Sequence, residues 1–197
     1  MAQVSTRGYL FYLVGPSGAG KDSLLDWLRQ QPSMQQLYFA PRTISRPCDN
    51  GIEQHHYLPA AEFATQSHRF ALQWQANGHR YGIDKQVLER LAQGQSVLVN
   101  GSRAEIAQAK RVAGEQLKVI LINVSAATLA TRLAQRGRED HQQIAHRLAR
   151  HQDLQHCPAD IVIDNNTSLE HAGNLLLTYI KQTCDAMPTT ASSCSRC

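Results

Sequence analysis

The stretch Gly15-Pro16-Ser17-Gly18-Ala19-Gly20-Lys21-Asp22-Ser23 decides the fold. An apolar run from Tyr9 to Val14 precedes it, and residues 24–28 after it, LLDWL, have helical spacing. A strand, a glycine-rich turn and a helix in this order form a phosphate-binding P-loop, because backbone N–H groups of the turn and the positive end of the helix dipole converge on one anion. Lys21 adds a full positive charge. We therefore expect all nine residues to bind the phosphates of a nucleoside triphosphate.

The motif departs from the usual pattern at Asp22, where a Ser or Thr would supply a hydroxyl ligand to Mg²⁺. We expect the Asp22 carboxylate to meet the metal directly or through a water, with the Ser23 hydroxyl as the less favoured substitute. The expected cofactors are therefore ATP and Mg²⁺.

Length and composition exclude several classes of protein. The chain has 197 residues, enough for one domain with a substantial core. Its longest apolar run, of six residues, is far too short for a membrane span, and residues 1–8 are too short and polar for a signal peptide. A net charge of +4 without a dense Lys/Arg run gives no indication of nucleic-acid binding. We expect a cytoplasmic protein that binds neither membrane nor nucleic acid.

The remaining chain alternates apolar strands with helices. Strands are expected at 96–100, 118–124 and 160–164, and helices at 85–93, 103–113, 126–135 with Ser125 as the cap, 140–155 and 168–183. Continuous apolar strands indicate a parallel sheet covered on both faces. The expected fold class is α/β, a P-loop NTPase with three α/β/α layers, an inserted acceptor-binding region and an Arg-rich lid.

A single domain is expected over 1–183, with the insert at about 34–84 and the lid at about 132–150. The insert is short of regular apolar patterns and rich in Gly, Pro, His, Asn and Tyr, so it is interpreted as a ligand-facing region and not as a packed crossover. Residues 184–197 contain little apolar sequence and are expected to be a disordered tail.

Arginines are concentrated in the proposed lid. Arg132 and Arg136 are four residues apart and share a helix face, and Arg138 follows Gly137. Arginines on a short, interruptible helix can close over ATP and neutralise the charge of the transferred phosphoryl group. We expect Arg132, Arg136 and Arg138 to be catalytic together with Lys21. The alternative is a solvated basic helix paired with the acidic residues at 139 and 140.

Ligands bind at the carboxyl edge of the sheet in such folds, and this edge is expected to bring together the P-loop, the segment after Asn100 and the basic stretch at 132–150. The insert carries Arg, Ser and Tyr donors that suit a phosphate on the acceptor, although Trp74 and Tyr81 could equally be packing residues. The strand expected at 96–100 ends in Asn100, where many P-loop kinases have a carboxylate. An acceptor phosphate is already anionic and needs no general base, so the neutral amide favours a phosphate acceptor over a hydroxyl.

Residues 8–182 resemble the guanylate-kinase-like branch of P-loop kinases. The matching segments are GPSGAGK at 15–21, ISRP at 44–47 with Tyr57 after it, NG at 77–78 followed by YG at 81–82, and the basic segment 132–138 with Arg147 after it. Guanylate kinases have a second arginine where this chain has Asp49, a guanine-binding glutamate where it has Gln73, and an aspartate where it has Asn100. The resemblance therefore implies phosphoryl transfer without recognition of a nucleobase.

Within this branch, the combination of TISRP, ANGxxYG and VLVNGSR resembles kinases of phosphonate breakdown. It implies transfer of the γ-phosphoryl group of ATP to the 1-phosphate of ribose 1,5-bisphosphate, giving 5-phospho-α-D-ribose 1-diphosphate and ADP. The partner is then a small phosphorylated sugar, and a homodimer is an open alternative to a monomer. The residues expected to bind the acceptor are Arg42, Arg46, Tyr57, Tyr81 and Arg147 through its phosphates, and Asn100, Ser102 and Arg103 through its ribose or the metal shell.

Two other interpretations stay open. A nucleoside monophosphate kinase would use Gln73 to bind a base. A catalytically silent guanylate-kinase-like binding module is the other, but such modules tend to lose the P-loop lysine and the lid arginines, and this chain keeps both.

Overall fold

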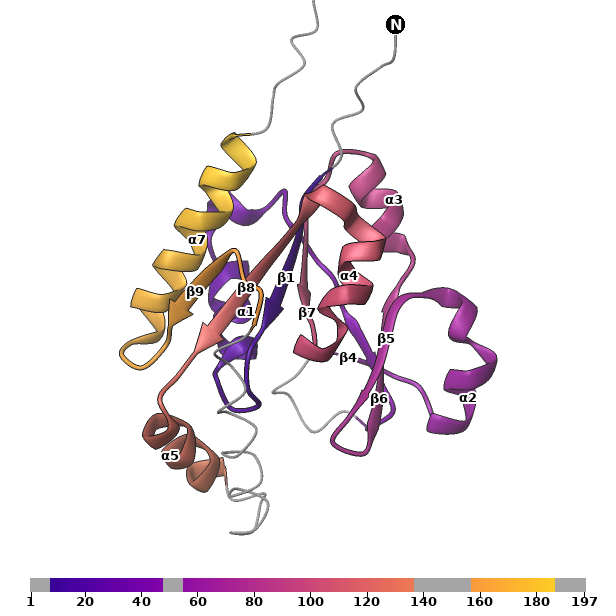
Figure 1. The fold of residues 1–197 in the computed structure, drawn as a ribbon, viewed down its shortest axis with the longest axis horizontal. Coiled ribbons are helices and arrows are strands. Elements are labelled where there is room, and N and C mark those ends of the chain that lie inside the picture. The colour runs from indigo at the N-terminus through magenta and orange to yellow at the C-terminus, as the bar shows by residue number, and fades with distance from the viewer. Residues whose placement is uncertain (1–7, 48–54, 137–156, 187–197) are drawn as a thin grey trace, which may run out of the picture.

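The computed structural model describes residues 8–47, 55–136 and 157–186, and a five-stranded sheet lies at its centre (Figure 1). The strands run in the order β2-β7-β1-β8-β9, and every neighbouring pair is parallel. Their bounds are β1 (Leu10–Val14), β2 (Tyr38–Phe39), β7 (Val97–Asn100), β8 (Leu117–Asn123) and β9 (Ile161–Asp164). Because all five point the same way, their carboxyl ends meet at one edge.

Helices cover both faces of this sheet, as the continuous apolar strands predict. Successive side chains of β1 point to opposite faces, and all five are buried. Phe11 and Leu13 pack with the buried residues of α1 and α7, while Leu10, Tyr12 and Val14 pack with those of α3 and α4. The helices are α1 (Lys21–Arg29), α3 (Gln86–Ala92), α4 (Ile106–Ala113), α5 (Ala126–Arg136) and α7 (Leu169–Asp185). The three-layer α/β/α prediction is confirmed.

Most expected elements are present within a few residues of their predicted bounds. Ser125 caps α5, since its Oγ accepts a hydrogen bond from Thr128 N at 3.0 Å. The closing helix continues to Asp185, two residues past the expected end of the domain, and Cys184 packs against the core. The expected helix at 140–155 lies outside the described residues.

The insert contains more regular structure than the sequence indicates. After β2 it forms a second, four-stranded sheet in the order β4-β3-β6-β5, with helix α2 (Ala60–Thr65) beside it (Figure 1). Its strands are β3 (Arg42–Ile44), β4 (His55–Tyr57), β5 (Phe70–Ala76) and β6 (His79–Asp84). Ile44, Leu72 and Ile83 are fully buried, so the insert adds a packed layer and not only loops.

Short 3₁₀ turns complete the described elements, at Pro32–Met34, Ser67–Arg69, Arg103–Glu105 and Gly114–Gln116. Within the described parts of the chain, no helix has the length and apolar content needed to cross a membrane.

Candidate active site

The P-loop connects the end of β1 to α1 at the carboxyl edge of the central sheet. Two of its glycines are required by geometry as well as by the motif. Gly18 and Gly20 have φ values of +94° and +86°, which L side chains rarely adopt. A Cβ at Gly18 would lie 2.9 Å from Leu129 Cδ1, and one at Gly20 would lie 2.7 Å from Asn165 Nδ2. The loop is therefore closely packed against α5 and the turn after β9.

Lys21, the first residue of α1, lies over the loop. Its Nζ donates hydrogen bonds to the carbonyl oxygens of Gly15 at 2.8 Å and Pro16 at 2.9 Å. The ammonium group is thus fixed on the side of the loop where the backbone N–H groups and the start of α1 would meet an anion. This placement matches the phosphate-binding role predicted for it.

Arg132 lies in α5 and contacts the loop from the other side. Its guanidinium donates to Ala19 O at 3.3 Å and to Asn165 O at 2.8 Å, while Asn165 Nδ2 donates to Ala19 O at 2.7 Å. Leu129 and Leu133 on the same helix are almost fully buried. The first part of the predicted lid is therefore a packed helix. Arg136 ends α5, while Arg138 and Arg147 lie outside the described residues.

Asp22 accepts hydrogen bonds from two other parts of the molecule. Its Oδ1 receives Arg42 Nη2 from β3 at 2.9 Å and Asn100 Nδ2 from the end of β7 at 2.8 Å. Asn100 is 3% exposed, and its Oδ1 is buried with no hydrogen-bond partner among the described residues. Three expected site residues, two for the acceptor and one for the metal, thus meet at one oxygen atom.

The Asp22 carboxylate suits a magnesium ion carried by the nucleotide. Mg²⁺ in such sites takes one or two carboxylates, phosphate oxygens and waters, not an all-protein cage. Asp22 supplies the carboxylate, and its Oδ1 is held by Arg42 and Asn100. Among the described residues there is no cluster of three His, Cys, Asp or Glu side chains that could hold a metal ion.

The segment after β7 is held by Tyr12, which the sequence analysis did not identify. Tyr12 Oη accepts a hydrogen bond from Ser102 N at 3.0 Å and donates one to Ser102 O at 3.2 Å. Burial raises the pKa of Tyr12 to about 12, so the hydroxyl keeps its proton. Its ring leaves no room for a side chain at Gly101, where a Cβ would lie 2.1 Å from Tyr12 Cζ. Tyr12 therefore positions Ser102 and the neighbouring Arg103.

Two of the expected acceptor residues, Tyr57 and Tyr81, lie in one row across the second sheet. Tyr57, Ile44, Tyr81 and Trp74 are consecutive cross-strand partners from β4 to β5, and Arg42 lies two residues before Ile44 on the same face. Because Arg42 reaches Asp22, this face is the one that meets the nucleotide-binding edge. Tyr57 is half exposed, as expected of a binding residue.

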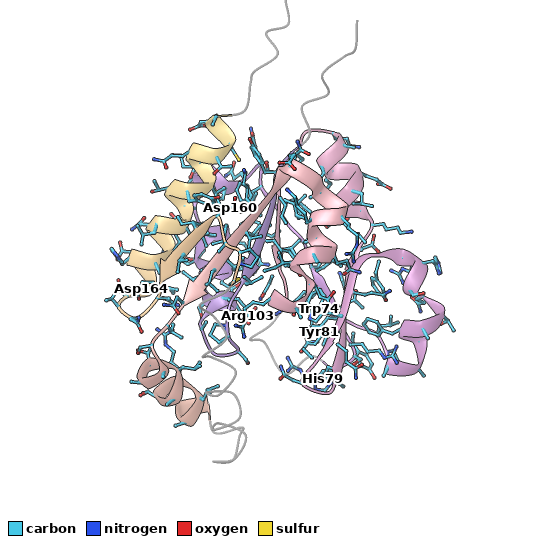
Figure 2. The ribbon with its side chains drawn as sticks, viewed as in Figure 1. Trp74, His79, Tyr81, Arg103, Asp160 and Asp164 are labelled. Carbon is cyan, nitrogen blue, oxygen red and sulfur yellow. The ribbon has the colours of Figure 1, made fainter. Side chains whose placement is uncertain are left out.

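Tyr81 has a packing role whether or not it also binds a ligand. Its ring stacks on Trp74 with centroids 5.3 Å apart and an interplanar angle of 2° (Figure 2). Arg46 lies in the loop after β3, where its carbonyl oxygen is 2.9 Å from His55 Nε2. The interaction of the Arg46 backbone with a buried histidine could not be read from the motif.

Asn165 is a further residue that the sequence analysis missed. It is 2% exposed and joins β9, the P-loop and Arg132 through the hydrogen bonds described above. In the sequence, Asn165 and Asn166 only follow the last expected strand, at 160–164, and carry no motif. The proximity of Asn165 to the P-loop follows from the sheet order, because β9 lies two strands from β1 with its carboxyl end at the same edge.

Comparison with known proteins gives consistent results. A family model described as guanylate kinase matches residues 7–183. The protein named ribose 1,5-bisphosphate phosphokinase PhnN from Pantoea vagans is 49% identical over 143 residues, covering 72% of this chain and 80% of that protein. The protein of the same name from Yersinia pestis is 44% identical, covering 85% and 88%.

Two further matches bear on length and fold. The protein of the same name from Laribacter hongkongensis is 45% identical over 93% of this chain, but the chain spans only 45% of that relative's length. The crystal structure of guanylate kinase from Anaplasma phagocytophilum superposes with a TM-score of 0.67 at 17% identity, covering 93% of this chain and 89% of that one. At this identity the likeness shows the fold alone.

Proposed function

The chain belongs to the guanylate kinase family, and we propose that it phosphorylates ribose 1,5-bisphosphate at its 1-phosphate with ATP. An oxygen of the 1-phosphate attacks the γ-phosphorus, the bond from that phosphorus to the β,γ-bridging oxygen breaks, and ADP leaves. The products are 5-phospho-α-D-ribose 1-diphosphate and ADP. The observation that favours a phosphate acceptor over a hydroxyl is the amide at the end of β7, and the relatives that share the name support the choice of sugar.

Asn100 has no basic group, so nothing at this strand end would take a proton from a hydroxyl acceptor. The described carboxylate nearest in this network is Asp22, whose Oδ1 is already hydrogen-bonded to Arg42 and Asn100. A phosphate oxygen arrives as an anion and needs no base. The arrangement therefore suits a phosphate acceptor, as in the reaction proposed.

On the nucleotide side, residues 15–23 would bind the ATP phosphates through the loop amides and Lys21. Magnesium bound by Asp22 would neutralise the phosphate charge when the nucleotide is present. Arg132 would hold the loop and α5 together, and with Arg136 and Arg138 it would supply the charge that stabilises the phosphoryl group in transfer.

On the acceptor side, the second sheet would bind the phosphates of the sugar. Its candidate ligands are Arg42 on β3, Arg46 in the loop after β3, Tyr57 on β4 and Tyr81 on β6. We assign these four residues, with Arg147, to the two phosphates. Asn100, Ser102 and Arg103 would contact the ribose or the metal shell. A homodimer and a cytoplasmic location stay predictions.

The competing interpretation is a nucleoside monophosphate kinase. Gln73 has an exposed side chain, and its backbone N–H donates to Gln108 Oε1 on α4 at 3.2 Å. The test is ADP release from ATP with ribose 1,5-bisphosphate, GMP and the other nucleoside monophosphates as separate acceptors. We expect turnover with the sugar to exceed that with any nucleotide by at least about a hundredfold. Faster ADP release with GMP would overturn the proposal.

A further inference from the structure

Residues 22 and 100 both depart from the usual pattern of P-loop kinases, and the carboxylate expected at position 100 is found at position 22. The P-loop position that normally has a hydroxyl has the carboxylate of Asp22, and the strand end that often has a carboxylate has the amide of Asn100. The two side chains are in direct contact, with Asn100 Nδ2 2.8 Å from Asp22 Oδ1. The two departures from the motif are therefore one structural feature.

Hydrogen-bond chemistry fixes the direction of this contact. An ionised carboxylate only accepts, so Asn100 must present its NH₂ group to Asp22 and turn its Oδ1 away. An aspartate at position 100 would instead place two carboxylates in contact, which is unfavourable for both anions. If position 22 were a threonine, its hydroxyl could donate to an aspartate at position 100. The contact is satisfied when one of the two positions has a carboxylate and the other has a hydrogen-bond donor.

Arg42 completes the feature from the second sheet. It donates to the same Asp22 oxygen, and its side chain is only 15% exposed. A charge-assisted bond of this kind holds the carboxylate in one orientation and balances its charge. The acceptor sheet is thereby connected to the first turn of α1, one residue from the P-loop lysine.

We propose that Asp22 and Asn100 are a reciprocal pair in which Asn100 is a positioning residue for the Asp22 carboxylate. This inference rests on the proposed function and deepens it, because it names the residue that orients the carboxylate assigned to the nucleotide's cation. Moving the carboxylate from β7 to α1 keeps an oxygen ligand for that cation, and the Asn100 amide holds this ligand in place.

The test is a four-member cycle of the parent chain, Asp22→Thr, Asn100→Asp and the double variant. We expect each single change to lower kcat/KM at least about thirtyfold and the double variant to recover to within about tenfold of the parent, because residues in direct contact are not additive. Losses that simply multiply in the double variant would overturn the pairing. Asp26→Asn, one turn along α1 with a 55% exposed side chain, is the matched control and should leave kcat/KM near the parent value.

A second measurement does not depend on the sugar. The affinity for a non-hydrolysable ATP analogue with Mg²⁺, relative to the analogue without metal, should fall about tenfold in each single variant and return in the double. An unchanged ratio in both single variants would contradict the role of the pair. Should the parent chain fail to phosphorylate the sugar, this ratio still tests the pair, so the two failures are distinguishable.

If Asn100→Asp does not fold alone, a folded double variant is itself the rescue expected, and an unfolded double variant contradicts it.

Discussion

The nucleotide half and the acceptor half of the site are built from different kinds of contact. Around the P-loop, Lys21, Arg132 and Asn165 all bond to main-chain carbonyl oxygens. At the acceptor side, Tyr12 and His55 also contact main-chain groups, of Ser102 and Arg46. Two other contacts there join side chains to each other, Asp22 with Arg42 and Trp74 with Tyr81. Main-chain geometry is common to many sequences that share a motif, whereas side-chain pairs change when one partner is substituted. We therefore expect the choice of acceptor to depend on the side-chain pairs.

The largest effect is expected at the nucleotide half. Lys21→Ala removes the charge that the loop holds beside the phosphates, and kcat/KM should fall at least about a thousandfold with either acceptor tested. Steady-state ADP release is the measurement. Lys118→Ala, which removes an ammonium group lying over the Tyr9 ring at the opposite end of β8, is the control and should change turnover little. Comparable losses in both variants would contradict a phosphate role for Lys21.

Arg132→Ala should lower turnover by at least about a hundredfold. Because its guanidinium also bonds to two carbonyl oxygens, the free energy of unfolding should fall by about 1–3 kcal/mol. Chemical denaturation and ADP release together check this. Arg111→Ala on the exposed surface of α4 is the control. Near-normal turnover in Arg132→Ala would show that this arginine has only a structural role.

A smaller and more selective effect is expected at the acceptor half. Arg42→Gln removes the cation that joins the second sheet to Asp22, and the KM for the sugar should rise about tenfold to thirtyfold. The KM for ATP should change less. Arg69→Gln, which loses an exposed ion pair with Asp84 on the same sheet, serves as the comparison. A change confined to the KM for ATP would place Arg42 with the nucleotide.

The smallest effect on turnover is expected at Tyr12, which supports the acceptor half from inside the core. Tyr12→Phe leaves Ser102 N without its partner, so stability should fall by about 1–3 kcal/mol with turnover reduced only a few fold. Turnover reduced as strongly as in Arg132→Ala would contradict a supporting role.

Tyr12 also predicts a pH dependence. Its pKa is raised from 10.0 to about 12 in the folded state, so the unfolded chain loses this proton first as pH rises. The corresponding stability is fully present below pH 10 and is lost between about pH 10 and 12. Denaturation across that range should show a steeper decline in the parent chain than in Tyr12→Phe. Parallel curves would contradict burial of an un-ionised hydroxyl.

Sequence analysis predicted the parts of the site that a short motif encodes. The strand, turn and helix of the P-loop follow from a short motif and its flanking sequence. The continuous apolar runs predict a parallel sheet, which brings the P-loop and the segment after Asn100 to one edge. The hydrogen bond between Asp22 and Asn100 was not predicted. The second sheet could not be predicted, because its short strands have polar faces and its pairing is between residues such as Ile44 and Tyr81 that are far apart in the chain. Tyr12 and Asn165 were missed because a core strand and a turn gave no signal of chemistry.

The position of the transferred phosphoryl group tests the central claim most directly. Phosphorus NMR of a mixture of the protein, ATP, Mg²⁺ and ribose 1,5-bisphosphate should show the 1-phosphate signal replaced by two coupled diphosphate signals, with the 5-phosphate unchanged. The coupled pair would show that a phosphate oxygen, and not a hydroxyl, received the phosphoryl group. A new phosphate monoester signal, or inorganic phosphate alone, would contradict the account.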